Sequence, residues 1–169
     1  MVRERAVLAL GQIADPSALP DLEKAATDPI AEPRASAAFA IGLIADPSAH
    51  AVLDQLAGDP SPKVRAAAAE ALGRLHDASG GPAVRGLLDD PDMPVRAAAA
   101  LGTWKFADPE PFLDALFAHL SAEDSGVRAA SAYAIARLAS AATAPVSSGA
   151  PVGHLSETGV TRARAALVE

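Results

Sequence analysis

The chain has 169 residues and a formal net charge of −7, and 43 of its residues are alanine. Six residues are aromatic and none is cysteine, which excludes disulfides, thiolate nucleophiles and cysteine-ligated metal sites. The acidic balance gives no general attraction for phosphate backbones or anionic membranes. No apolar run reaches the roughly 18 residues of a membrane span. We therefore expect no nucleic-acid partner and no membrane association, and the lack of a secretory signal favours a cytoplasmic location.

A repeated sequence pattern runs along the chain. Its copies begin near residues 2, 33, 64, 95 and 127, and each carries an arginine at the same early position: Arg3, Arg34, Arg65, Arg96 and Arg128. The sequence numbers of successive arginines differ by 31, 31, 31 and 32. Such regularity over five copies indicates tandem structural units.

Each unit predicts a helical hairpin. In the third copy, apolar residues from Val64 to Leu75 recur at intervals of three and four, as on one face of a helix. The second helix is predicted to begin at an Asp-Pro pair, as at Asp15-Pro16 and Asp46-Pro47. Aspartate accepts the unpaired N–H groups of a first turn, and proline suits the first helical position. Further Asp-Pro pairs close the unit, so we expect two helices of about 12 residues each.

The units resemble the short HEAT-like repeats that are named after the phycobilisome lyases. In that family a Val-Arg pair precedes an alanine-rich helix that ends in Ala-Leu-Gly, and here Val64-Arg65 is followed by Ala71-Leu72-Gly73. The first copy matches with Val2-Arg3 and Ala9-Leu10-Gly11. The resemblance covers residues 1–140 and implies an all-α fold, a right-handed α-solenoid of about five helical hairpins (an α-α superhelix). It implies no single activity, because such repeats occur in scaffolds, lyases, hydroxylases and glycosylases.

The C-terminal part departs from the repeat. Residues 141–157 are rich in alanine, serine, proline and glycine and are predicted to form a loop. Residues 158–169 regain helical character as a partial terminal helix, in which Arg162 resembles the start of a sixth repeat. Neither end resembles the polar cap of a solenoid. We therefore expect a part of a longer protein, whose uncapped ends can associate end to end.

The repeated arginines fall among apolar residues that should be buried, so each guanidinium needs an acceptor. Aspartates of the preceding hairpin recur at a fixed offset and can supply it: Asp15, Asp46, Asp77 and Asp108. The sequence therefore favours a structural Arg-Asp ladder between adjacent repeats over a basic stripe for phosphate.

The fourth copy breaks the pattern with bulky residues. Trp104 replaces the glycine of the first three copies, and the following helix contains Phe112, Leu113 and Phe117. One interpretation is that these residues fill the core. The other is a partner-binding site made by Trp104, Phe112, Leu113 and Phe117, on the inner surface where second helices of such solenoids are presented.

Large residues also recur at one offset of the first helices. This row contains Leu8, Phe39, Leu101 and Tyr133, with Glu70 interrupting it in the third copy. We interpret it as packing between neighbouring first helices. The glycines Gly11, Gly42 and Gly73 are likewise predicted to allow close helix packing, since no phosphate-binding glycine motif is present.

No catalytic, cofactor-binding or metal-binding constellation is found in the sequence. The hydroxylases that share this repeat hold iron with His-Glu pairs, and this chain has none. We therefore expect a non-catalytic scaffold, without a cofactor, that binds a protein partner or a neighbouring domain. Two alternatives remain: an accessory region of a multidomain bacterial enzyme, such as a peptidyl-prolyl isomerase, or a bilin-lyase-like subunit.

Overall fold

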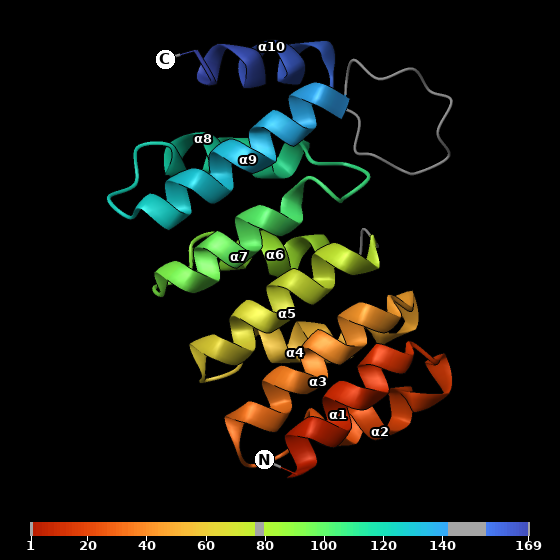
Figure 1. Cartoon of the computed structure of the whole chain (residues 1–169). Helices are drawn as coiled ribbons and strands as arrows, with labels where there is room; N and C mark the ends of the chain where they lie inside the picture. Colours follow the sequence, from red (N-terminus) through yellow and green to blue (C-terminus); the bar gives the residue numbers. More distant parts are fainter. Residues whose placement is uncertain (1, 77–79, 142–154, 169) are drawn as a thin grey trace.

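The computed structural model describes residues 2–76, 80–141 and 155–168, and these ranges contain α-helices and 3-10 turns but no strand. The helices form two layers of a solenoid (Figure 1). The first helices of the hairpins are α1 (Val2–Ile13), α3 (Ala31–Ile44), α5 (Pro62–Leu75), α7 (Met93–Thr103) and α9 (Ser125–Ala141). The second helices are α2 (Leu19–Ala25), α4 (His50–Ala57), α6 (Gly81–Leu87), α8 (Leu113–His119) and α10 (Glu157–Ala166). The all-α solenoid expected from the repeat is confirmed.

The second helices of the first four hairpins are shorter than expected. Helices α2, α6 and α8 have seven residues and α4 has eight. In the described residues, 3-10 turns precede α2, α4 and α8: η1 (Pro16–Ala18), η2 (Pro47–Ala49) and η4 (Glu110–Phe112). The capping role predicted for Asp15 and Asp46 is confirmed, because each carboxylate accepts an N–H two residues later at 2.9 Å. The cap therefore starts a 3-10 turn, and the α-helix begins only after it.

Small residues bring the first helices into close contact. A methyl group added to Gly11 would lie 2.6 Å from the Cα of Ala40, and one added to Gly42 would lie 2.8 Å from the Cα of Ala71. A methyl group added to Gly73 would likewise lie 2.7 Å from the Cα of Gly102. These distances confirm the packing role predicted for the glycines. They leave no space for a side chain at these contacts between α1, α3, α5 and α7.

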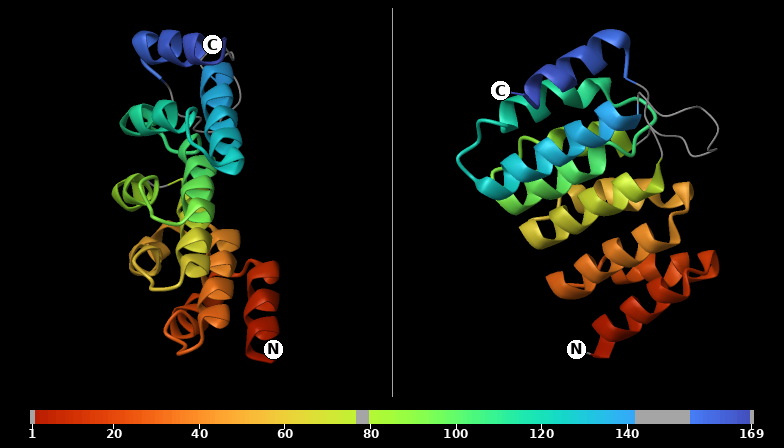
Figure 2. Two further views of the ribbon diagram at one scale, coloured as in Figure 1. Left: turned by 90° about the vertical axis from the view of Figure 1, so that its left-hand side faces the viewer. Right: turned by 45° about the horizontal axis from the view of Figure 1, so that its top comes forward.

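The two layers therefore differ in spacing. Each first helix packs extensively against the next first helix, whereas neighbouring second helices make few mutual contacts. The more closely spaced layer lies on the inner side of the curve, and the left view of Figure 2 shows this for α1 to α9. The expectation that second helices line the inner surface is therefore wrong. The glycine and alanine contacts between first helices are the physical reason.

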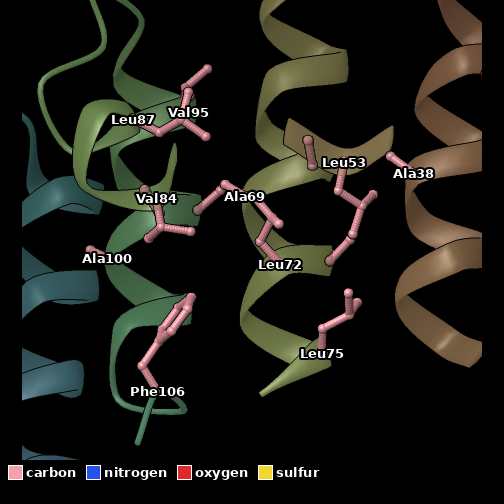
Figure 3. Packing of buried hydrophobic residues seen from close by; sticks show 14 of the residues in the cluster. Ala38, Leu53, Ala69, Leu72, Leu75, Val84, Leu87, Val95, Ala100 and Phe106 are labelled. Carbon is pink, nitrogen blue, oxygen red and sulfur yellow. The ribbon is translucent and has the colours of Figure 1, made fainter. Parts of the chain in front are cut away.

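The core lies between the layers and continues along the solenoid. Leucine and valine side chains of the second helices insert against alanine-rich first helices, and Leu53, Leu72 and Val84 are at most 1% exposed. Figure 3 shows Leu53 of α4 beside Leu72 of α5. Phe106 and Phe112 are also buried, with ring centroids 5.2 Å apart. Large side chains from both layers, such as Leu53 and Leu72, thus fill the space between the alanines of the first helices and give dense packing.

The helix α10 closes the described structure at its C-terminal end. It packs on both α8 and α9, with Ala163 fully buried. Arg162, which resembled the start of a sixth repeat, donates to the Oδ1 of Asp114 in α8 at 2.6 Å. These contacts correspond to the second helix of a fifth hairpin. The predicted loop falls mostly on residues 142–154, which lie outside the described residues. None of the described helices combines the length and the apolar character that a bilayer crossing requires.

Candidate binding surface

Two rows of side chains cross the face of the first helices that points away from the second helices. We call one of them the apolar row. It has one member in each copy: Leu8, Phe39, Glu70, Leu101 and Tyr133. Residues four positions later lie on the same helix face, except that Lys105 stands in the turn after α7. In the third, fourth and fifth copies they form the basic row, which contains Arg74, Lys105 and Arg137. The two rows therefore run side by side across successive repeats.

The apolar row is not fully used in packing, contrary to our interpretation of the sequence. Leu101 is 41% exposed and Tyr133 is 50% exposed, while Leu8 and Phe39 are half-buried. The positions three and four residues before Leu101 and before Tyr133 hold alanine, so these two large side chains rise above small neighbours. The curvature of the solenoid places this face on its inner side (Figure 2). The large residues of the row are thus available for contact with another molecule.

Two shallow hollows lie along the rows. One has a volume of about 220 Å³ and is lined by Glu70, Arg74, Leu101, Gly102 and Lys105. The other has about 330 Å³, and its lining includes Leu8, Phe39, Lys63 and Glu70. Both contain Glu70, so they adjoin each other on α5. Together they extend the face over the first four repeats.

The basic row is only partly neutralised by its neighbours. The guanidinium of Arg74 lies over the ring of Phe39, 5.0 Å from its centroid, and its Nη2 is 3.5 Å from the Oε2 of Glu70. Its Nη1 is buried and has no hydrogen-bond acceptor in the described structure. Burial, and then the charge of Arg74, lowers the pKa of Lys105. The guanidinium of Arg137 lies over Trp104, 4.4 Å from the ring centroid.

The structure separates the four residues of the predicted partner-binding site. Phe112 and Leu113 are buried in the core, which agrees with the first of the two interpretations. Trp104 and Phe117 are half-buried and lie in different layers, because Trp104 follows α7 and Phe117 belongs to α8. Phe117 is covered by the guanidinium of Arg162, at 4.9 Å. Only Trp104 lies next to the rows described above.

The repeated arginines are paired with other carboxylates than those expected. Arg34 binds Asp59 with its Nε and Nη2 at 2.7 and 2.8 Å, and Arg65 binds Asp90 in the same way at 2.7 and 2.9 Å. These aspartates close the arginine's own hairpin. Asp15 and Asp46 cap the 3-10 turns instead, and Asp108 accepts the N–H of Glu110. The expected pairing with the preceding hairpin is therefore wrong for Arg34 and Arg65. Asp77 and the side chain of Arg3 lie outside the described residues.

Backbone carbonyls complete the ladder. Arg34 donates to the carbonyl of Asp28 at 2.8 Å, Arg65 to that of Asp59 at 2.9 Å, and Arg96 to that of Asp90 at 2.6 Å. Each arginine thus holds the loop before its own helix. In the second and third copies it also holds the loop that closes the hairpin. Arg128 donates to the carbonyls of Ala122 and Glu123.

Charge pairing changes the ionisation of the ladder aspartates. The hydrogen bond from Arg34 is the main cause of the lowered pKa of Asp59, and that from Arg65 has the same effect on Asp90. Burial acts in the opposite direction on both carboxyls but is the weaker effect. Because both aspartates are at most 9% exposed, these are internal structural pairs. They add no positive charge to the surface.

His119 at the end of α8 gives a pH-dependent contribution to stability. Burial is the main cause of its lowered pKa, followed by the charge of Arg96, while Asp89 and Arg85 also face it with opposing effects. A histidine with a lowered folded pKa contributes stability that is present at neutral pH and is lost as pH falls below the unfolded value of about 6.5. We expect the free energy of unfolding, measured by urea denaturation, to fall between about pH 7.5 and about pH 5.5. His119→Gln should reduce that fall, and an unchanged fall would contradict the assignment.

The described residues contain no group of three or more His, Cys, Asp or Glu that could hold a metal ion. Sequence reasoning found the apolar row but not the basic row beside it. The signal was present, because Arg74, Lys105 and Arg137 follow one another at the same spacing as the repeated arginines of the ladder. Positive charge recurring at the repeat period, four residues after a row of large side chains, would have indicated one shared face.

Comparisons with known proteins agree with this architecture. A family model of HEAT repeats matches residues 22–102, and a model of the PBS lyase HEAT-like repeat matches residues 2–28. A search among curated proteins finds no match. A designed armadillo repeat protein has a similar structure, with a TM-score of 0.61 and 21% identity over 98% of this chain and 92% of that chain.

Two further solved structures are similar over almost the whole chain. A designed armadillo repeat protein in complex with the peptide (KR)4 has a TM-score of 0.61 and 22% identity, over 97% of this chain and 91% of that chain. The complex of CpcE and CpcF of phycocyanin lyase from Nostoc sp. PCC7120 has a TM-score of 0.59 and 19% identity. That match covers 98% of this chain and 72% of that chain. At these identities the similarity shows a common fold only.

Proposed function

Because this chain belongs to the HEAT-like repeat proteins, we propose that it is a non-catalytic scaffold whose first-helix face binds an extended segment of another protein. Proteins of this architecture present a long continuous surface, since each repeat adds an equivalent strip to the one before. The apolar row and the basic row are such a surface. The second-helix layer is used mainly to bury leucine and valine in the core.

The observation that carries the proposal is the exposure of Leu101 and Tyr133 in one row. Single exposed apolar residues are common, but large ones repeated along one face mark interaction surfaces. Aromatic anchors supply much of the binding energy in protein interfaces. Tyr133 is such an anchor, and Trp104 lies nearby under Arg137. Of the four residues first considered, we retain Trp104 as a contact at the edge of this face.

The comparison with a solenoid that holds a peptide supports this class of function. That designed armadillo repeat protein is similar to this chain over 97% of its length and was solved with the peptide (KR)4. A solenoid of similar fold can therefore hold a peptide. The similarity to a phycocyanin lyase subunit, at 19% identity, shares the fold and assigns no lyase activity to this chain.

A peptide selection tests the proposal whatever the identity of the partner. We expect a displayed library of random peptides to yield clones that bind the wild-type chain and that lose binding to the Leu101→Ser/Tyr133→Ser variant. Both side chains are substantially exposed, so the variant should keep its melting temperature. Gln55→Ser, an exposed change on α4 in the other layer, is the control and should leave binding intact. Selected peptides that bind all three proteins equally, or a selection without enrichment, would refute the proposal.

A further inference from the structure

The basic row concentrates positive charge on an otherwise acidic molecule. The chain has 14 basic and 21 acidic residues. Arg34 and Arg65 are already paired within the ladder. In contrast, Arg74, Lys105 and Arg137 stand at equivalent positions of successive repeats, where Glu70 is the acidic residue lining the hollow beside them. The face therefore differs in charge from the molecule as a whole.

The contacts of these cations indicate that an acceptor is missing. The Nη1 of Arg74 is buried without a hydrogen-bond acceptor in the described structure, and a buried donor that lacks a partner is costly. Lys105 lines the same hollow, and the positive charge of Arg74 disfavours its charged form. A carboxylate in the hollow would offset the repulsion between the two cations, and a rotation of the Arg74 guanidinium would bring its Nη1 to that carboxylate.

The distance between repeats suits an extended polypeptide. Packed helices such as α7 and α9 lie about 8 to 10 Å apart, and two residues of an extended chain advance about 7 Å and return to the same side, close enough for flexible side chains to span one interval. A peptide that crosses the first helices between the two rows can direct every second side chain toward Leu101 and Tyr133. The intervening side chains then point toward Lys105 and Arg137.

We propose that this face recognises an extended acidic segment of a partner protein, in which apolar and acidic residues alternate; this inference rests on the proposed function. The apolar side chains contact the apolar row at Leu101 and Tyr133. The carboxylates bind the basic row, and one of them occupies the hollow between Arg74 and Lys105. The designed armadillo repeat protein described above was solved with a basic peptide, (KR)4, whereas the basic row of this chain favours an acidic one.

Binding of matched synthetic peptides tests this inference. The probe is a fluorescein-labelled peptide of alternating leucine and glutamate residues, and its counterparts carry glutamine or lysine in place of glutamate. We expect fluorescence anisotropy to show the tightest binding for the glutamate peptide, with affinity that falls as salt is raised. Lys105→Gln/Arg137→Gln should weaken that binding about tenfold. Arg85→Gln, which removes a partly exposed arginine of the other layer, should leave it unchanged.

The outcomes distinguish this inference from the proposed function. Equal binding of the glutamine and glutamate peptides would overturn the charge preference, while peptides selected from the library would still support a binding scaffold. Tighter binding of a labelled oligonucleotide than of the glutamate peptide would overturn the inference in favour of nucleic acid. The same change in affinity for Arg85→Gln and for the double variant would also overturn it, because it would show a non-specific effect of net charge.

Discussion

Arg65→Ala is expected to lower the free energy of unfolding by about 3 kcal/mol, because it breaks a buried, doubly hydrogen-bonded ion pair. The side chain of Arg65 is 13% exposed and that of Asp90 is 6% exposed. Without the guanidinium, the Asp90 carboxylate keeps the N–H of Asp92 as its hydrogen-bond donor. The carbonyl of Asp59 also loses a donor. Urea denaturation followed by circular dichroism measures the change.

Arg96→Ala is the matched control for this prediction. Arg96 donates to the carbonyls of Asp90 and Pro91, and position 121, which corresponds to Asp59 and Asp90, holds serine. Its removal breaks hydrogen bonds to neutral acceptors and a charge interaction with Asp90 that is weaker than that of Arg65, so we expect a loss of about 1 kcal/mol. Equal losses in the two variants would contradict the importance of the ion pair.

The pH dependence provides a second check on the same pair. Arg65 lowers the pKa of Asp90, so the stability from their pairing is present above the ordinary pKa of an aspartate and is lost as pH falls below it. The difference in free energy of unfolding between the wild type and Arg65→Ala should therefore shrink at about pH 3. A constant difference from about pH 7 to about pH 3 would argue against an ionic contribution.

Gly42→Ala is expected to destabilise the chain by about 2 kcal/mol through overpacking between helices, although alanine is the better helix former. The new methyl carbon would lie 2.8 Å from both the Cα and the Cβ of Ala71. Relief of this overlap requires α3 and α5 to separate along their contact, and such overpacking costs more than the helix propensity of alanine returns. The melting temperature measures the effect.

Gly86→Ala is the control, because it makes the same chemical change in a helix where space is free. A methyl group on Gly86 has no atom within 4 Å outside its immediate chain neighbours and its own helix backbone, and the residue is exposed in α6. We expect this variant to gain about 0.5 to 1 kcal/mol from helix propensity and reduced chain entropy. Destabilisation by both variants would show that a glycine is required for a reason other than contact between helices.

Local features of the fold were predictable because they depend on short segments. The repeat period predicts the hairpins, Asp15 and Asp46 cap their turns, and Gly42 lies at a helix contact. Each of these follows from a few consecutive residues and their known preferences. The length of the second helices was predicted less well, since a 3-10 turn and an α-helix begin with the same capping signal.

Long-range pairing could not be derived from the period alone. Two sets of aspartates recur at the repeat spacing, and both stand at fixed offsets from the arginines. The choice of Asp59 and Asp90 over Asp46 depends on how the two helices of one hairpin pack on each other. The exposure of Tyr133 is a similar case. It depends on which layer is more closely spaced, a property of all the helix contacts together.

The ladder also determines how far unfolding of one hairpin spreads to the next. Arg34 donates to the carbonyl of Asp28 at the end of the first hairpin, and the carbonyl of Asp59 accepts Arg65 of the third, so the loss of the second hairpin breaks hydrogen bonds to both of its neighbours. In a linear array such nearest-neighbour coupling sets the size of the cooperative unit. The carboxylate series stops at Asp90, because residue 121 is serine. The second and third hairpins thus each hold an internal ion pair, and the fourth keeps only the bonds from Arg96 to the carbonyls before it, so its closing loop is expected to open while the second and third hairpins remain folded.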